Sequence, residues 1–264
     1  KKMSLSSRLR VLPVKALEDN YMYLLWNVEK KRALCVDPVE PAKILQAAKD
    51  EQVTIEGALI THHHWDHAGG NVELRKLHAT VHIVGGDERI EEMNQTVKHG
   101  ENIDIAGMKI RCFSTPCHTR GHVCYAISEG DDEVVFTGDT LFIAGCGKFF
   151  EGEASEMHTN LNTILSSLPD NTRVFPGHEY TTSNLRFAAH VEPENEDIAR
   201  KLSWSLAQDA KHEPTVPSTI GEEKKINPFM RVAVERVKQF TGATDGVTVM
   251  KLLREAKNGF KPKA

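Results

Sequence analysis

The 264-residue sequence lacks several features that would decide its class at once. No apolar run reaches about 18 residues, the length of a membrane-spanning helix, so we expect no segment to cross a membrane. Positive charge is not in excess, and the formal net charge of -4 argues against a general nucleic-acid binder. Repeats and low-complexity tracts are also absent. The composition, 40% hydrophobic and 27% charged, is that of a globular protein with one large domain and room for an appendage.

Cysteines are few and follow no pairing pattern. There are five, an odd number, and no two form a C-x-x-C pair: Cys35, Cys112, Cys117, Cys124 and Cys146. This favours a reduced intracellular protein over a disulfide scaffold. We expect a cytoplasmic monomer, with the mitochondrial matrix as the alternative location. The chain starts Lys1-Lys2-Met3 without a visible signal peptide, so either two residues precede a natural start or a longer leader has been removed.

One short stretch, residues 61–71, organises the chain. It reads T-H-H-H-W-D-H-A-G-G-N and directly follows residues 55–60, an apolar run that predicts a buried strand. A chance cluster of histidines in a polar loop is the simpler interpretation. The spacing of the histidines and their place at a strand end argue against it.

The histidines of this stretch are spaced for metal binding. Alternate residues of an extended chain point the same way, so His62 and His64 should converge while His63 faces away. Asp66 and His67 follow the bend and can reach a second point nearby. The pattern H-x-H-x-D-H thus supplies two pairs of ligands, which suits two adjacent metal ions better than one.

Up to about residue 180, short strands alternate with helices. Strands are predicted at 9–14, 21–27, 33–36, 55–60, 80–84, 108–113, 123–127, 133–136 and 173–175. Helices are predicted at 41–52, 72–77, 88–97 and 155–168. This order predicts a layered α/β sandwich.

The pattern changes after residue 180. Helices are predicted at 184–190, 195–211, 228–240 and 248–257, with proline-rich residues 213–217 between them. We therefore expect one domain over residues 1–180 and a helical domain over residues 181–264.

Asp37 ends the third predicted strand, before Pro38. Proline cannot continue a strand ladder and restricts the residue before it. Asp37 either orients a histidine ligand or is a simple turn residue, and the sequence leaves both interpretations open.

Three further ligand candidates follow strand ends downstream: His118, Asp139 and His178. Neutral imidazole and carboxylate groups suit zinc, and also iron or manganese. Two metals about 3.5–4 Å apart need a bridging group. The two-oxygen carboxylate of Asp139, with small neighbours, is the natural candidate.

These motifs together resemble a known family. T-H-H-H-W-D-H-A-G-G-N, T-P-C-H-T, F-T-G-D-T-L-F and G-H-E-Y-T are similar to segments of glyoxalase II, the hydroxyacylglutathione hydrolases of the metallo-β-lactamase superfamily. The resemblance covers nearly the whole chain, including V-E-P, P-T-V-P-S-T and N-P-F-M-R in the helical part. It implies a four-layer αββα sandwich, of class α/β, with a C-terminal helical substrate-binding domain.

Carried over residue by residue, the resemblance implies two metal sites and a bridge. The first site is His62, His64 and His118; the second is Asp66, His67 and His178; the bridge is Asp139. Asp66 and Asp139 are the expected catalytic carboxylates, and the cofactor is two divalent metal ions, zinc or else iron or manganese. Cys117 and His122 lie near these motifs but match no ligand position.

The implied reaction is thioester hydrolysis. With both carboxylates and a bridging hydroxide, two divalent metals keep one net positive charge, which can polarise a carbonyl. Metal binding can lower the pKa of water from 15.7 to about 7. A metal-bridging hydroxide is then expected to cleave S-D-lactoylglutathione into D-lactate and glutathione, the second step of methylglyoxal detoxification.

Substrate-binding positions also follow from the resemblance. Lys148, Tyr180, Arg254 and Lys257 match glutathione-contacting positions. Lys148 ends a glycine-flanked loop that lacks P-loop spacing. Without the resemblance, Arg254 and Lys257 would be interpreted as the solvated face of a final helix. Phe150 stands where many relatives carry tyrosine, so one polar contact is lost while the ring can still pack on the substrate.

Other functions fit less well. A persulfide dioxygenase-like enzyme would use one iron held by two histidines and an aspartate, which leaves His64, Asp66 and His67 unexplained. A β-lactamase would bring a signal peptide, and a nuclease would bring a basic surface. A non-catalytic metal-binding protein of the same fold is disfavoured because all seven ligand positions are intact.

Overall fold

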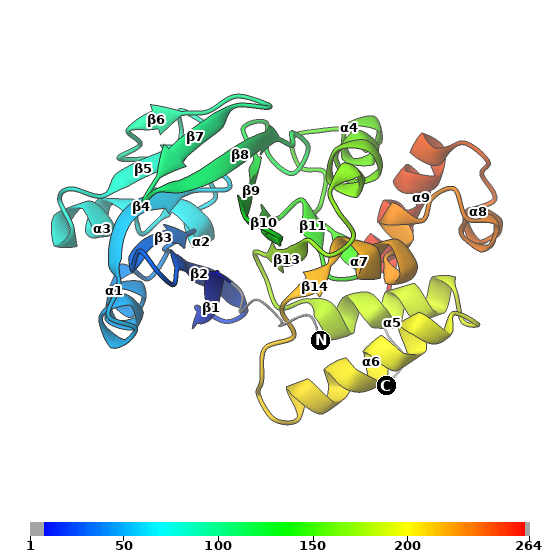
Figure 1. The fold of residues 1–264 in the computed structure, drawn as a ribbon. Coiled ribbons are helices and arrows are strands. Elements are labelled where there is room, and N and C mark those ends of the chain that lie inside the picture. Colours follow the sequence, from blue (N-terminus) through cyan, green and yellow to red (C-terminus); the bar gives the residue numbers. More distant parts are fainter. Residues whose placement is uncertain (1–7, 262–264) are drawn as a thin grey trace. The chain divides into compact units, whose positions relative to one another are not determined.

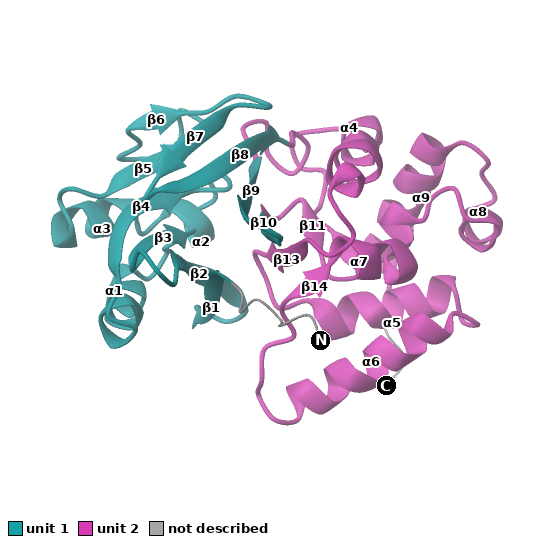
Figure 2. Cartoon of the chain, viewed as in Figure 1, with its two compact units in different colours: residues 1–114, 123–136 teal, residues 115–122, 137–264 magenta. Residues whose placement is uncertain are grey.

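The computed structural model describes residues 8–261, which form two compact units (Figures 1 and 2). Unit 1 contains the chain up to Ser114 together with Val123–Phe136. Unit 2 contains Thr115–His122 and the chain from Thr137 onward. The chain therefore passes from one unit to the other after Ser114, after His122 and after Phe136.

The first sheet of unit 1 has the order β1-β2-β3-β4-β5-β6. Its strands are β1 (Leu9–Ala16), β2 (Asn20–Asn27), β3 (Arg32–Val36), β4 (Thr54–Leu59), β5 (His82–Gly85) and β6 (Gln95–Thr96). Strands β1 to β3 pair antiparallel and β3 to β6 pair parallel. Parallel neighbours need a crossover, which helices α1 (Pro41–Asp50) and α3 (Asn71–Leu77) supply on either side of β4.

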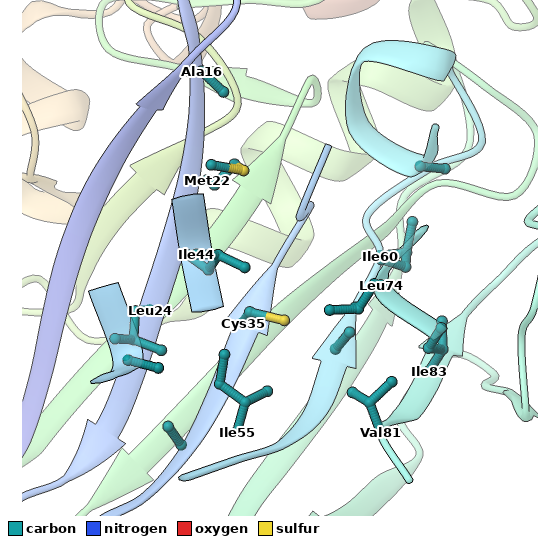
Figure 3. Close-up of a cluster of buried hydrophobic side chains, with 14 of the residues drawn as sticks. Ala16, Met22, Leu24, Cys35, Ile44, Ile55, Ile60, Leu74, Val81 and Ile83 are labelled. Carbon is teal, nitrogen blue, oxygen red and sulfur yellow. The ribbon is translucent and has the colours of Figure 1, made fainter. Parts of the chain in front are cut away.

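Buried apolar side chains of the first sheet pack against side chains of α1 and α3 and form a core (Figure 3). Ile44 from α1 and Leu74 from α3 are fully buried in it, together with Ile55 and Ile60 at the two ends of the β4 segment. Burying such side chains is worth about 1.5–3 kcal/mol each. The start of the segment that follows Ile60 is therefore held in place by the core.

The second sheet of unit 1 is antiparallel. It contains β7 (Asn102–Ile105), β8 (Met108–Ser114), β9 (Val123–Glu129) and β10 (Asp132–Gly138), whose last two residues belong to unit 2. The backbone N–H of Val123 donates to the carbonyl of Thr61, and the hydroxyl of Tyr125 donates to that of Ile60, both at 2.8 Å. Strand β9 thus fixes the chain just beyond β4.

Unit 2 is mainly helical. It contains the hairpin β11 (Leu141–Phe142) and β12 (Gly145–Cys146), the pair β13 (Arg173–Pro176) and β14 (Ser218–Thr219), and short turns η1 (Asn160–Ile164), η2 (Leu165–Ser167) and η3 (Pro228–Met230). Its helices are α4 (Ala154–Thr159), α5 (Thr181–Val191), α6 (Glu196–Asp209), α7 (Ile220–Ile226), α8 (Glu235–Thr241) and α9 (Gly246–Gly259). Side chains of Asn195 and Asp245 accept hydrogen bonds from the first turns of α6 and α9, which fixes where these helices begin.

Every strand predicted from the sequence overlaps an observed one, but one predicted helix is wrong. Residues 88–97 form turns that end in β6. The side-chain oxygen of Asn94 accepts a hydrogen bond from the backbone N–H of Ile83. The backbone N–H of Asn94 donates to the carbonyl of Ile83. These bonds attach the segment to the edge of β5, and this pairing replaces a helix of weak propensity.

Two other predicted helices are interrupted. Residues 155–168 begin as α4, then widen into the π-helix η1 and tighten into η2. Residues 228–240 divide into η3 and α8, because Arg231 leaves the helical path to form a bidentate ion pair with Glu192 at 2.8 Å. Helix α7 was not predicted. Within residues 8–261, every helix is too short or too polar to traverse a lipid bilayer.

Candidate active site

Four candidate ligands in unit 1 form what we call the unit-1 cluster: His62, His64, Asp66 and His67. The first two lie on the extended chain after β4, and the others lie on the short helix α2 (Trp65–Ala68). His62 Nε2 lies 3.1 Å from His64 Nδ1, and His67 Nε2 lies 3.5 Å from an oxygen of Asp66. His63 turns instead to Asp87, 3.4 Å away. The predicted convergence of alternate histidines is confirmed.

Asp37 orients this cluster. Its carboxylate accepts hydrogen bonds from the backbone and the hydroxyl of Thr61, both at 2.7 Å, and lies 2.9 Å from His67 Nδ1. The Thr61 oxygen lies 3.0 Å from His62 Nδ1. Because the Thr61 hydroxyl donates its hydrogen to Asp37, its oxygen accepts a hydrogen bond from His62 Nδ1. Both imidazoles therefore hold a proton on Nδ1 and keep the Nε2 lone pair for another partner. Asp37 thus contacts the candidate ligand His67 directly and His62 through Thr61, and is more than a turn residue.

Asn20 fixes Asp66 in the same way. Its side-chain N–H group donates to the backbone oxygen and to a carboxylate oxygen of Asp66, each at 3.0 Å. Asn20 is buried at the start of β2. This role was not predicted, because a single asparagine 46 residues before Asp66 carries no spacing signal.

Three candidate ligands in unit 2 form the unit-2 cluster: His118, Asp139 and His178. The Nε2 atoms of His118 and His178 lie 3.3 and 3.5 Å from the same oxygen of Asp139. All three side chains are at most 9% exposed. Three loops that are far apart in sequence thus bring two imidazoles to one carboxylate oxygen.

Main-chain groups orient the unit-2 cluster. His118 Nδ1 donates to the carbonyl of Lys148 at 3.0 Å, so its Nε2 keeps the lone pair. The backbone N–H of Asp139 donates to His122 Nε2 at 3.1 Å. His122 therefore carries its proton on Nδ1, which lies 2.9 Å from the hydroxyl oxygen of Thr115. His122 is not a ligand in this arrangement; it positions the backbone of Asp139, a role that the sequence analysis missed.

Gly147 allows the chain to pass close to this cluster. A Cβ atom at this position would lie 1.9 Å from the carbonyl oxygen of Asp139 and 3.1 Å from His118 Nδ1. No other residue type fits at that distance. The glycine before Lys148 is therefore required by close packing, and phosphate binding by this loop need not be invoked.

Cys117, next to His118, is fully buried, and burial raises the pKa of its thiol to about 12. A thiol with that pKa stays protonated at neutral pH and is a poor nucleophile and metal ligand. This agrees with its exclusion from the predicted ligand set.

Three of the predicted substrate-binding residues border the unit-2 cluster. The ring of Tyr180 stacks on His178, with centroids 4.7 Å apart and planes at 2°. The ring of Phe150 lies 5.1 Å from that of His118 and is 61% exposed, with the ammonium group of Lys148 5.7 Å from its centre. An exposed aromatic ring and a lysine beside an imidazole are groups that can offer apolar and cationic contacts to an anionic ligand.

The other two lie on α9. Arg254 is buried, at 8% exposure, and donates to the carbonyl of Cys146 at 2.8 Å. Lys257 is half-buried and donates to the carbonyl of Ser183 at 3.2 Å. Burial, followed by repulsion from Arg254, lowers the pKa of Lys257 to about 8. For Arg254, the interpretation as part of a solvated helix face is wrong.

The donor set fits divalent metal ions. All seven candidate side chains belong to histidine and carboxylate groups that can hold a metal ion. Of the five histidines, His62 and His67 in unit 1 and His118 in unit 2 have one ring nitrogen engaged by the protein while the other faces a fellow ligand. That is how proteins orient metal-binding imidazoles. Nitrogen and oxygen donors of this kind suit zinc, iron and manganese.

Two family models match consecutive parts of the chain, and they agree with similar relatives. A family model described as the metallo-beta-lactamase superfamily matches residues 18–178, and one described as the hydroxyacylglutathione hydrolase C-terminus matches residues 179–260. A hydroxyacylglutathione hydrolase-like protein of Gallus gallus is 46% identical over 96% of this chain and 91% of its own length. The cytoplasmic hydroxyacylglutathione hydrolase of Arabidopsis thaliana is 41% identical, over 96% of this chain and its own full length.

Solved structures show the same fold. ETHE1 from Myxococcus xanthus superposes with a TM-score of 0.67 at 25% identity, covering 96% of this chain and 92% of its own. A metallo-beta-lactamase from Staphylococcus aureus superposes with a TM-score of 0.66 at 20% identity, covering 98% and 75%. The chain thus has the α/β metallo-β-lactamase fold with a helical C-terminal region.

Proposed function

The chain belongs to the hydroxyacylglutathione hydrolase, or glyoxalase II, family of the metallo-β-lactamase superfamily, and on that premise we propose its reaction. The substrate is S-D-lactoylglutathione, or a related S-2-hydroxyacylglutathione, and the products are the hydroxy acid and glutathione. This reaction is the second step of methylglyoxal detoxification. The observation that carries the proposal is the orientation of His62, His67 and His118: the protein holds Nδ1 of each ring, and Nε2 of each faces another candidate ligand.

The cofactor in this proposal is two divalent metal ions, zinc in the first place and iron or manganese as alternatives. One is assigned to His62, His64 and His118, the other to Asp66, His67 and His178, with Asp139 shared. When bound, the metals supply a hydroxide at neutral pH and an electrophile for the thioester carbonyl, since a metal can lower the pKa of water to about 7. The ligand assignment is supported by the two preformed clusters and by the family motifs.

The protein's own side chains hold the reacting groups in place. Asn20 fixes the carboxylate of Asp66, and His122 fixes the backbone of Asp139. These two carboxylates would balance two of the four positive charges of two divalent metals and a hydroxide a third, so the site would keep one net positive charge for the developing oxyanion. The leaving group is a thiolate, which needs no proton from the protein at neutral pH.

Cationic and aromatic side chains bind the glutathione part. Lys148, Arg254 and Lys257 provide positive charge for its carboxylates. Phe150 and Tyr180 provide ring faces for its apolar atoms. Arg254 and Lys257 lie on α9, so residues 181–264 form a substrate-binding domain, while residues 1–180 carry catalysis and contribute Lys148, Phe150 and Tyr180 to substrate binding. The family model that matches residues 179–260 supports this division.

We further propose that the protein acts as a monomer in the cytoplasm, with the mitochondrial matrix as the alternative. One relative, from Arabidopsis thaliana, carries "cytoplasmic" in its name. The five cysteines are all free and buried, which suits a reducing compartment.

The test is a substrate panel on purified protein. Release of free thiol is followed with S-D-lactoylglutathione, with S-acetylglutathione, and with a lactoyl thioester of a thiol that lacks the peptide. We expect the first to be cleaved fastest and the last slowest, because it cannot reach Lys148, Arg254 or Lys257. Equal rates on all three would contradict the glutathione assignment. Oxygen consumption with glutathione persulfide and no thioester cleavage would favour the dioxygenase alternative.

A further inference from the structure

The hairpin formed by β11 and β12 is too small to hold itself in place. Only two residue pairs face each other across it. The second turn residue, Ala144, has φ +54°, a left-handed conformation that disfavours any residue except glycine. Short two-stranded hairpins are unstable in water by themselves. The β11–β12 hairpin must therefore be held by its surroundings.

Two buried side chains at α7 hold it. A carboxylate oxygen of Glu223 accepts a hydrogen bond from the backbone N–H of Ala144 at 2.8 Å and from Asn227 Nδ2 at 3.0 Å. Asn227 Nδ2 in turn donates to the carbonyls of Phe142 at 3.2 Å and of Gly145 at 3.0 Å. Glu223 and Asn227 are both completely buried. Their polar atoms thus bind the main chain on both sides of the strained turn.

The outgoing strand β12 and the residues directly after it contact two predicted site residues, Arg254 and His118. The carbonyl of Cys146 accepts from Arg254, and the carbonyl of Lys148, two residues later, accepts from His118 Nδ1. A shift of the hairpin would therefore move a predicted substrate-binding cation and turn the ring of a predicted metal ligand.

The incoming strand β11 also contacts predicted site residues, through the aromatic ring of Phe142. Phe142 lies edge-on to Tyr180, with centroids 5.2 Å apart, and edge-on to His178 at 6.0 Å. The two strands therefore contact both kinds of predicted site residue in unit 2, ligands and substrate-binding residues.

We propose that Glu223 and Asn227 are positioning residues of the active site, which act by holding the β11–β12 hairpin against the unit-2 cluster. The role of the hairpin in substrate binding rests on the proposed glutathione thioesterase activity. The hairpin's attachment to α7 is independent of that activity, so it can be tested separately.

The surroundings of Glu223 show which substitution should preserve the contact. Burial raises the pKa of this carboxyl to about 7, while hydrogen bonds from Ser218, Ala144 and Asn227 oppose that shift. The other carboxylate oxygen lies 2.5 Å from the hydroxyl of Ser218, which can accept as well as donate. A glutamine can keep its carbonyl toward Ala144 and donate its amide N–H to Ser218. Glu223→Gln is therefore the conservative variant.

The experiment compares this variant with two disruptive ones and a control. Glu223→Ala removes the acceptor of the Ala144 N–H, and Glu223→Asp, which perturbs the core less, draws the carboxylate back. The control is Glu222→Gln, which removes a charge from the neighbouring residue of α7. Glu222 pairs with Lys201 at 2.8 Å and contacts the hydroxyl of Ser218.

Two readouts are needed. The first is the rate at which a thiol reagent labels Cys146, which is 4% exposed on β12, with the labelled peptide identified by mass spectrometry. The second is the split between KM and kcat for S-D-lactoylglutathione, with metal content measured on the same samples. Labelling reports the hairpin alone, whereas KM also reports the substrate-binding residues that it contacts.

We expect Glu223→Ala and Glu223→Asp to label Cys146 faster by at least about tenfold and to raise KM by about tenfold with metal retained. Glu223→Gln and Glu222→Gln should stay close to the wild-type protein in both readouts. Unchanged labelling and KM in both disruptive variants would overturn the proposal. Equal acceleration at all five cysteines would also overturn it, because that pattern means general destabilisation. Wild-type protein without thioesterase activity would contradict the proposed function, while the labelling contrast would still decide whether Glu223 holds the hairpin.

Discussion

The unit-1 and unit-2 clusters contain the same kinds of donor groups, imidazole and carboxylate, but the protein holds these groups in place differently. The unit-1 cluster comes from six consecutive residues, and distant side chains, Asp37 and Asn20, orient it. The unit-2 cluster comes from three separate loops: the main-chain carbonyl of Lys148 orients His118, and Asp139 is held through its own backbone N–H, which donates to the side chain of His122. Support in unit 1 can thus be removed by changing a side chain. Support in unit 2 depends on where the backbone runs.

The largest expected effect comes from the shared carboxylate of the unit-2 cluster. Asp139→Ala should lower kcat/KM by at least about 10³-fold, because it removes the proposed bridge and unbalances the charge of the site. Steady-state kinetics and metal analysis on the same sample measure this. Asp170→Ala, which removes a surface carboxylate paired with Lys224 in the same unit, is the matched control. Undiminished activity in Asp139→Ala would refute the proposed mechanism.

The next prediction tests main-chain support in unit 2. Gly147→Ala places a Cβ atom 1.9 Å from the carbonyl oxygen of Asp139, so the chain must move. We expect kcat/KM to fall by about 10²-fold, as for a displacement of about 1 Å at a site. Gly259→Ala, at the end of α9 with nothing within 4 Å of the added atom, should change little. If both variants kept full activity, backbone placement would not be what orients this cluster.

Side-chain support in unit 1 should have an intermediate effect. Asp37→Asn turns an acceptor of the His67 Nδ1 proton into an amide that can present N–H to it. Metal affinity should fall by about 10–100-fold, the usual effect of losing such a partner. Competition with a chelator measures it. The matched variant Asp87→Asn, beside the outward-facing His63, should bind metal normally. A similar loss in both variants would mean that the effect is not specific to the ligands.

A smaller effect concerns pH and the α9 cations. Burial lowers the pKa of Lys257 from 10.5 to about 8, so its ammonium form is present below pH 8 and is lost above it. KM should therefore be constant up to about pH 7 and rise several-fold as the pH passes 8. Lys257→Arg keeps its charge, since the pKa of arginine exceeds 12, and should flatten this rise. An identical pH profile in both proteins would exclude Lys257 as its cause.

The smallest effect is expected at Phe150. The ring is 61% exposed, so a hydroxyl can be added without disturbing the core. Phe150→Tyr should lower KM by a factor of about 2–10, the value of one uncharged hydrogen bond of roughly 0.5–1.5 kcal/mol. The melting temperature should not change. An unchanged KM would show that a hydroxyl at this position makes no such contact with the substrate.

The contrast between contacts among neighbouring residues and contacts between distant residues explains what the sequence alone could predict. The unit-1 cluster follows from strand alternation over a few residues, so the convergence of His62 and His64 was predictable. The choice between two roles for Asp37 was not, because its contact with His67 joins residues 30 positions apart. Glu223 was not identified either: no local pattern distinguishes it from Glu222, although Glu223 is buried and Glu222 is half-buried and pairs with Lys201.

Secondary structure was predictable wherever local and tertiary preferences agree. Every predicted strand overlaps an observed one, although the short strands β6, β7, β11, β12 and β14 were not predicted. The predicted helix at 88–97 was wrong because Asn94 bonds to Ile83 at a sheet edge. Likewise, the helix at 228–240 is interrupted where Arg231 turns to Glu192. In each case a long-range polar contact outweighs helix propensity, which is worth less than about 1 kcal/mol per residue.

The central claim is that both clusters together serve one metal-dependent hydrolysis, and a metal titration tests it most directly. The protein is stripped of metal and restored with zinc, and hydrolysis of S-D-lactoylglutathione is measured at each addition. We predict no activity without metal and a rise that levels off at about two ions per chain, as expected for a two-metal site. Activity in the stripped protein, or none at any zinc, iron or manganese content, would contradict the claim.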